Sequence, residues 1–232
     1  MSKLYQHVFF DLDHTLWDFD NNSKQTLSEL LLQHGIDTKI ELNFEVFHNK
    51  FLEINSTYWE LFRMGHISKE TLRKERFAKL FNTFNFFDDK LITIIASEYV
   101  LHGPQKSGLV YYAKELLIYL EKNYSLHIIT NGFTDVQYVK LHCSGIYSLF
   151  KEIITSEIAG FKKPSLGIFE YALKRVNASA ENCLMIGDEL HVDIIGAKKS
   201  GIDQVYFNPK CAFHSEEVTY EVKSLKELFD IL

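Results

Sequence analysis

Five short apolar segments separated by stretches with helical periodicity constrain the fold of this chain most strongly. The segments are 5–10 (YQHVFF), 126–130 (LHIIT), 152–155 (EIIT), 183–186 (CLMI) and 204–207 (QVYF). Apolar runs with little alternation are typical of parallel strands that are covered on both faces. Helical patterns precede or separate the last four of them, over 109–122, 133–142, 166–176 and 192–200. This rhythm predicts an α/β fold with a doubly wound parallel sheet, and a loop and closing helix up to Leu232.

The segment between the first two strands has a different pattern. Residues 18–102 contain no convincing strand but show about four helical stretches, over 21–35, 43–65, 68–84 and 88–103. Asn22 and Ser23 resemble N-terminal caps of the first stretch, and Ser68 and Asp88 those of the last two. An insertion of this length is too large for an ordinary loop. We therefore expect an all-helical cap at 18–102, inserted into an α/β core formed by 1–17 and 103–232.

Composition excludes several classes of protein. The chain has 25 Lys and Arg against 31 Asp and Glu, a formal charge of −6, so a nucleic-acid polymer is not an expected partner. Its three cysteines form no CxxC pair, which favours a reducing compartment. No apolar run approaches membrane-spanning length. These features predict a cytoplasmic protein that does not bind membranes.

Polar side chains follow three of the predicted strands, at the point where each strand ends. They are Asp11 and Asp13, then Thr130 and Asn131, then Asp188 with Asp193 five residues later. In an open parallel sheet, ligands bind beyond the carboxyl ends of the strands, where the strand order reverses. Carboxylates gathered there need a cation, and oxygen ligands favour Mg²⁺. Lys163, in the sequence FKKP, adds a cation just before a predicted helix.

With this ordered set of residues, the chain resembles the haloacid dehalogenase superfamily of phosphatases. The four motifs that carry the resemblance are DLDHT at 11–15, Thr130 in ITNG, Lys163 in FKKP and GDELHVD at 187–193. The helical insertion resembles the C1-type cap of that superfamily. The segments IITNGF, AGFKKPSLGIFEYAL and GIDQVYFNP are similar to its pyrimidine 5′-nucleotidase branch. True dehalogenases lack an acid at the position of Asp13, so halide displacement is not expected.

The resemblance implies a role for each acidic residue. Asp11 would attack phosphorus and form an aspartyl-phosphate, and Asp13 would act as general acid and then as general base. Mg²⁺ would be held by the Asp11 carboxylate, the Asp13 main-chain carbonyl and the Asp188 carboxylate. Asp193 would orient Lys163 or a metal-bound water.

The remaining site residues are expected to bind substrate. Thr130, the backbone N–H of Asn131, and Lys163 would hold the phosphoryl oxygens. Trp17 and Trp59 are the aromatic residues that we expect to stack on a substrate base, although aromatic residues at helical spacing more often belong to a core.

The expected function is therefore that of a Mg²⁺-dependent phosphomonoesterase acting on a small phosphorylated metabolite, with a pyrimidine nucleoside 5′-monophosphate as the favoured substrate. A sugar-phosphate phosphatase, or a phosphomutase similar to β-phosphoglucomutase, is the alternative on the same scaffold. A non-catalytic binding module is a remote third interpretation, because such a module need not keep Asp11, Asp13, Thr130, Lys163 and Asp188.

Overall fold

The computed structural model describes residues 5–36 and 43–232, and the chain divides into two compact units. Met1–Asp18 and Ser107–Leu232 form an α/β unit, and Phe19–Lys106 form a helical unit. The expected insertion, 18–102, differs from the helical unit by one residue at its start and four at its end. The later end has a structural reason: the short helix η1 (Gly103–Gln105) directly continues α4 (Asp89–His102) and packs against it.

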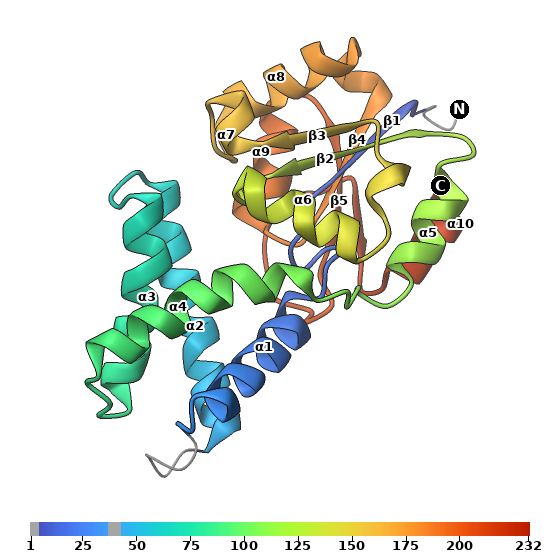
Figure 1. Cartoon of the computed structure of the whole chain (residues 1–232). Helices are drawn as coiled ribbons and strands as arrows, with labels where there is room; N and C mark the ends of the chain where they lie inside the picture. Colours follow the sequence, from blue (N-terminus) through green and yellow to red (C-terminus); the bar gives the residue numbers. More distant parts are fainter. Residues whose placement is uncertain (1–4, 37–42) are drawn as a thin grey trace. The chain divides into compact units, whose positions relative to one another are not determined.

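A parallel sheet forms the centre of the α/β unit, as predicted, and β1 lies inside it (Figure 1). The strand order is β3-β2-β1-β4-β5-β6. The strand bounds are β1 His7–Phe10, β2 Ser125–Thr130, β3 Glu152–Thr155, β4 Cys183–Gly187, β5 Asp203–Phe207 and β6 Tyr220–Val222. Phe10 pairs in register with Ile128 on one side and with Ile186 on the other. The residues after β1, β2 and β4 therefore meet at one edge of the sheet.

Helices cover both faces of this sheet. Helices α8 (Leu166–Val176) and α9 (Ile195–Lys199) pack on one face, where Phe169 and Ala197 join a core with Phe9, Ile129 and Met185. The right-handed crossovers of parallel strands place α5 and α6, which precede and follow β2, on the other face. The remaining helical segments are α5 Ala113–Leu120, α6 Thr134–Cys143, η2 Tyr147–Leu149, α7 Ser156–Ala159, η3 Ala180–Asn182, η4 Leu190–Ile194, η5 Leu225–Glu227 and α10 Leu228–Ile231.

Three sequence predictions in the α/β unit need correction. The helix expected over 109–122 begins only at Ala113, because Tyr112 has a left-handed backbone (φ 69°) and Val110 donates its N–H to Leu16. The helix expected over 192–200 starts as a π-helical turn, η4, and continues as α9. The tail also contains a strand, β6, which is too short to show an apolar run and forms by pairing with β5.

The helical unit consists of α1 (Phe19–Gln33), α2 (Phe44–Arg63), α3 (Lys69–Thr83) and α4, followed by η1. Its core contains Phe47, Phe51, Phe77 and Phe81. Asn43, Ser68 and Asp88 accept backbone hydrogen bonds as N-terminal caps of α2, α3 and α4. In the part of the chain that the structure describes, no helix is long and apolar enough to cross a membrane.

The start predicted for the first of these helices is wrong. Asn22 and Ser23 do not cap α1 but lie inside it and are buried, because the helix already begins at Phe19. Ser23 Oγ lies 3.0 Å from His48 Nε2 and donates to the carbonyl of Asp20. A polar residue that resembles a cap in the sequence thus has hydrogen-bond partners in the helical unit instead.

Two histidines stack inside the sheet and make the fold sensitive to acid. His127 on β2 is buried, and its Nε2 lies 3.1 Å from His7 Nδ1 on β1. Burial, together with the charges of His7 and Lys151, lowers the pKa of His127 from 6.5 to about 4. The neutral ring is therefore favoured in the folded state, so this stabilisation is present above pH 6.5 and is lost as the pH falls toward 4.

We expect His127→Leu to remove this acid sensitivity. When the pH is lowered from about 7 to about 5, protonation linked to His127 should decrease the unfolding free energy of the wild type by about 2 kcal/mol. The variant should not show this decrease. Urea unfolding of both proteins at the two pH values measures the difference. Equal pH dependence in the two proteins would show that His127 is not the sensitive group.

Candidate active site

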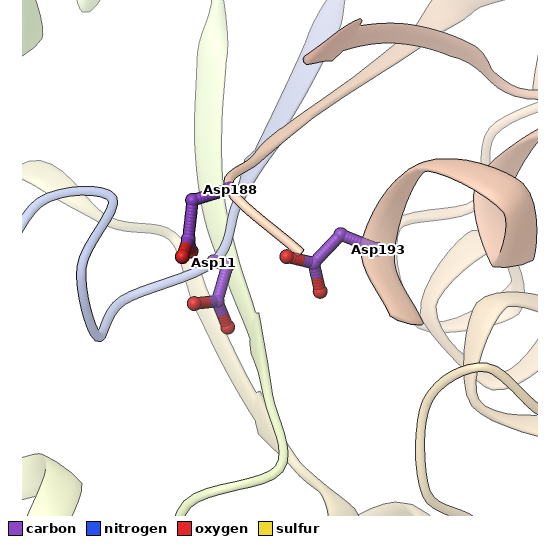
Figure 2. A group of neighbouring side chains, drawn as sticks. All are labelled: Asp11, Asp188 and Asp193. Atoms are coloured by element: carbon purple, nitrogen blue, oxygen red, sulfur yellow. The ribbon is translucent and has the colours of Figure 1, made fainter. Parts of the chain in front are cut away.

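Three carboxylates converge where β1 and β4 end (Figure 2). Asp11 directly follows β1, Asp188 directly follows β4, and Asp193 lies on η4. One oxygen from each carboxylate lies within 4.8 Å of the other two. Thr15 Oγ1 donates a hydrogen bond of 2.9 Å to Asp188 Oδ1, which fixes the direction of that carboxylate. Adjacent strand ends thus bring together carboxylate oxygens, the ligand type that divalent cations such as Mg²⁺ prefer.

Lys163 is the cation that neutralises part of this cluster. Its side chain is 2% exposed, and Nζ lies 2.5 Å from Asp11 Oδ1 and 2.7 Å from Asp193 Oδ1. Nζ also donates to the backbone carbonyl of Ile129 on β2. Burial alone would lower the pKa of Lys163, but the charges of Asp11 and Asp193 outweigh it and raise this pKa above its ordinary value. Lys163 is therefore charged at neutral pH.

The carboxylates themselves are held in an unfavourable environment. Burial raises the pKa of Asp11 to about 7, with a further rise from Asp193, although Lys163 acts in the opposite direction. Burial and then the charges of Asp11 and Asp193 raise the pKa of Asp188 well above its ordinary value. Two buried acids that resist ionisation beside each other are stabilised in their charged form by a bound cation.

Gly187 leaves the space that Asp193 occupies. A Cβ added to Gly187, the last residue of β4, would overlap the Asp193 carboxylate. Asp193 Oδ2 accepts the backbone N–H of Glu189 at 3.2 Å, while Oδ1 faces Lys163. The π-helical turn places Asp193 between these partners. With both oxygens in contact with protein donors, Asp193 is better suited to hold Lys163 than to bind a metal.

Thr130 and Asn131 follow the end of β2 and connect the site to the Lys163 loop. Asn131 Nδ2 donates to the carbonyl of Lys163 at 3.0 Å, and the N–H of Lys163 donates to Asn131 Oδ1 at 2.8 Å. This reciprocal pair fixes the backbone before Pro164, where the peptide bond is cis. Thr130 is buried, and its Oγ1 accepts the N–H of Gly132 at 3.0 Å.

Asp13 points to a different set of partners, on α6. Its Oδ1 lies 2.5 Å from Lys140 Nζ, and its Oδ2 accepts from Gln137 Nε2 at 2.9 Å. Burial would raise the pKa of Asp13, but Lys140 and Gln137 outweigh burial and hold this pKa below its ordinary value. The Asp13 side chain is therefore ionised in this arrangement and is not part of the carboxylate cluster of Asp11, Asp188 and Asp193.

Sequence reasoning missed three residues that contact the predicted site residues. They are Thr15, Gln137 and Lys140. Thr15 stands inside the DLDHT motif, and Gln137 and Lys140 share one face of the predicted helix 133–142 at a spacing of three residues. The sequence therefore indicates that these two polar residues lie on the same side of the helix, but it does not indicate that this side faces the sheet.

The two predicted substrate-binding tryptophans lie in different units. Trp17, in the α/β unit, is 2% exposed, and Lys140 Nζ lies 4.4 Å from its ring centroid. Trp59, on α2 of the helical unit, is half-buried and packs edge-to-face against Phe62. Stacking of either ring on a substrate stays a prediction.

The fold and these strand ends define an α/β protein with an aspartate-centred site. A family model for haloacid dehalogenase-like hydrolases matches residues 5–201, and the chain belongs to this family. It is 33% identical to the pyrimidine 5′-nucleotidase PynA of Streptococcus pneumoniae, over 98% of this chain and 95% of that protein. It is 29% identical to a glyceraldehyde 3-phosphate phosphatase of Methanothermobacter thermautotrophicus, over 87% and 84% of the two chains.

A solved relative has the same fold over its whole length. The magnesium-bound crystal structure of the HAD-hydrolase YfnB from Bacillus subtilis superposes with a TM-score of 0.87 at 31% identity, covering 99% of both chains. That crystal structure reveals interdomain movement in YfnB. The family and fold predicted from the sequence are confirmed by these similarities.

Proposed function

We propose that this protein is a phosphomonoesterase that hydrolyses pyrimidine nucleoside 5′-monophosphates through an aspartyl-phosphate on Asp11. The observation that carries the proposal is the placement of the Asp11 carboxylate at the end of β1, held by Lys163 and next to the carboxylate of Asp188. The similarity to PynA over nearly the whole chain supports the substrate class. The α/β unit contains every proposed catalytic group.

The chemistry follows from these groups. An oxygen of Asp11 attacks phosphorus and forms a P–O bond while the bond to the leaving alcohol breaks. The alcohol oxygen takes a proton from the protonated carboxyl group of Asp13, which leaves Asp13 ionised. Water then attacks the aspartyl-phosphate and gives a proton to Asp13, which releases orthophosphate and restores Asp11. The contacts of Asp13 with Lys140 and Gln137 favour its ionised form, so the described arrangement suits this second step.

Charge on the phosphoryl group is stabilised by residues from two other strand ends. Lys163 supplies a fixed positive charge, and the Thr130 hydroxyl and the Asn131 backbone N–H supply hydrogen-bond donors. The family resemblance assigns these three residues to the phosphoryl oxygens, and the contacts of Asn131 with Lys163 support a common location.

The residues present fit a bound Mg²⁺. Asp11 and Asp188 would hold it with their carboxylates, and Asp13 with its main-chain carbonyl. The oxygen-only donors and the raised pKa values of Asp11 and Asp188 support this fit. When bound, Mg²⁺ would neutralise the two carboxylates and the phosphoryl oxygens.

Magnesium should stabilise the protein more at high pH than at low pH. Because the pKa of Asp11 is raised to about 7, this carboxyl stabilises the folded state most below its unfolded pKa of 3.8, and that contribution is lost as the pH rises through 7. Protons also compete with the cation for Asp11 and Asp188. The Mg²⁺ concentration is set to about 100 times the dissociation constant at about pH 8. At this fixed concentration, Mg²⁺ should add about 2.7 kcal/mol to the unfolding free energy at about pH 8 and clearly less at about pH 5.5.

Thermal unfolding with Mg²⁺ and with EDTA at both pH values measures this difference. Asp188→Asn should reduce the magnesium-induced shift, whereas Asp230→Asn, an exposed acid on α10, should leave it unchanged. A shift of equal size at the two pH values would contradict the assigned ligands.

A substrate panel tests the proposed function. Purified protein with Mg²⁺ should release phosphate from uridine and thymidine 5′-monophosphates with a higher kcat/KM than from adenosine 5′-monophosphate, hexose phosphates or glyceraldehyde 3-phosphate. An absence of turnover on every phosphate ester, with tight binding to a protein partner, would instead favour the non-catalytic module.

A sugar-phosphate phosphatase is the second candidate, and the relatives named glyceraldehyde 3-phosphate phosphatase favour it. Under this function, glyceraldehyde 3-phosphate would be the best substrate of the panel. A phosphomutase would convert a hexose 1-phosphate into its 6-phosphate isomer without net release of phosphate, which the same assay distinguishes.

A further inference from the structure

Two buried polar side chains on α6, those of Gln137 and Lys140, contact the proposed acid–base residue Asp13. Gln137 is fully buried, and its Nε2 lies 2.9 Å from Asp13 Oδ2 and 2.8 Å from Thr130 Oγ1. Lys140 is 6% exposed, and its Nζ lies 2.5 Å from Asp13 Oδ1. One face of α6 therefore holds both carboxylate oxygens of Asp13 and the hydroxyl of Thr130.

The contacts of Thr130 determine where its hydroxyl hydrogen points. Oγ1 accepts one hydrogen bond from Gln137 Nε2 and another from the N–H of Gly132. A hydroxyl oxygen has two lone pairs and one hydrogen, so both acceptor positions are used. The hydrogen is thus directed away from these donors and is available to a phosphoryl oxygen. Gln137 orients Thr130 as a donor.

The Gln137 amide is held in this orientation at a cost. Nε2 donates both to the Asp13 carboxylate and to the Thr130 hydroxyl, so Oε1 points away from these two groups. Oε1 is buried and has no hydrogen-bond partner among the described residues. Gly132 provides the space, because a Cβ at that position would overlap the Gln137 side chain. A residue that served stability alone would not leave a buried acceptor unpaired.

Lys140 is fixed by contacts with two residues that flank the same turn. Its Nζ pairs with Asp13 and lies over the ring of Trp17, 4.4 Å from the centroid. The ring face attracts the ammonium group, which limits its movement. Lys140 Nζ donates to Asp13, whereas Gln137 Nε2 donates to both Asp13 and Thr130.

We propose that Gln137 and Lys140 are positioning residues, with Gln137 coupling the acid–base residue Asp13 to the phosphate-binding Thr130 and Lys140 holding Asp13. This inference rests on the proposed function, since it assigns how the groups of that reaction are oriented. The two residues should therefore differ in what their loss does to phosphate binding.

Substitution by methionine removes the donors and keeps the length of each side chain. Gln137→Met should lower kcat for a nucleoside monophosphate by about 10²-fold. It should also weaken orthophosphate binding by about tenfold, because the Thr130 hydrogen is no longer directed. Lys140→Met should lower kcat by about 10²-fold with a smaller change in KM and in orthophosphate binding. Gln137→Glu places a carboxylate against Asp13, so its kcat should fall at least as much as that of Gln137→Met.

The leaving group of the substrate separates a positioning role from a structural one. The nitrophenolate of p-nitrophenyl phosphate leaves without a proton, whereas the alkoxide of a nucleoside does not. Lys140→Met should therefore lose less activity on p-nitrophenyl phosphate than on the nucleoside monophosphate. Lys140→Arg, which keeps the positive charge, should recover part of the difference. Lys114→Met, on the exposed side of α5, is the matched control and should behave as wild type.

Circular dichroism and thermal unfolding verify that each variant is folded, and calorimetry measures orthophosphate binding without turnover. Equal losses of Lys140→Met on the two substrates, or unchanged orthophosphate binding in Gln137→Met, would overturn the inference. If the wild type hydrolyses neither ester, the proposed function fails, while the calorimetric comparison still decides the role of Gln137.

Discussion

Asp11→Asn is expected to reduce phosphate release by at least about 10⁴-fold, because the amide that replaces the carboxylate is a poor nucleophile. The substitution preserves the size of the side chain of a buried residue, which is 8% exposed. In the variant, Lys163 keeps the buried carboxylate of Asp193 as its ion-pair partner, so the fold should be retained. Initial rates with a nucleoside monophosphate and with p-nitrophenyl phosphate measure the loss.

The nucleophile assignment can be separated from a general effect of charge. Asp230→Asn removes one exposed acid from the same unit and should leave both rates unchanged. Mass spectrometry of the wild type quenched with acid during turnover should detect a protein heavier by one phosphoryl group, and Asp11→Asn should lack it. Turnover by Asp11→Asn at the rate of the wild type would contradict the proposed mechanism.

Lys163→Met is expected to damage both activity and stability. The substitution leaves the buried carboxylates of Asp11 and Asp193 without their common cation. Removing one partner of a buried ion pair costs about 3 kcal/mol or more of unfolding free energy. The loss of one fixed charge beside the phosphoryl group should reduce kcat/KM by about 10³-fold. Urea unfolding in EDTA and steady-state kinetics with Mg²⁺ measure the two effects separately.

A double variant distinguishes the two effects of Lys163. Adding Asp193→Asn to Lys163→Met removes one uncompensated charge, so it should recover part of the stability but none of the activity. Lys162→Met tests the adjacent lysine of the same FKKP sequence, and its unfolding free energy should change by about 0.5 kcal/mol or less. If Lys162→Met causes the larger loss, the assignment of Lys163 is wrong.

Much of the fold could be predicted from the sequence because buried parallel strands leave continuous apolar runs. The segments expected at 152–155 and 166–176 have those same bounds in the structure, as β3 and α8. Elements that depend on a partner could not be predicted in this way. The strand β6 has three residues and no apolar run, and only pairing with β5 makes it a strand.

The candidate site shows the same division. Asp11 and Asp188 follow adjacent strands in register, so sequence position alone brings them together with Asp193 and Lys163. The orientation of each side chain depends on tertiary contacts. Asp13 stands two residues from Asp11, yet its carboxylate contacts α6. The contribution of Gln137 and Lys140 depends on which face of α6 lies against the sheet, and a short polar helix does not indicate that face.

The close packing of Gly187 against Asp193 has a consequence for how the enzyme tolerates change. A single added methyl group at Gly187 would overlap the aspartate that holds Lys163, and through this lysine it should disturb Asp11, the proposed nucleophile. Gly187 has no functional group, yet it should tolerate substitution as poorly as the acids around it. Libraries of random variants should find position 187 intolerant even to alanine, and scans that rank positions by chemical function alone would overlook it.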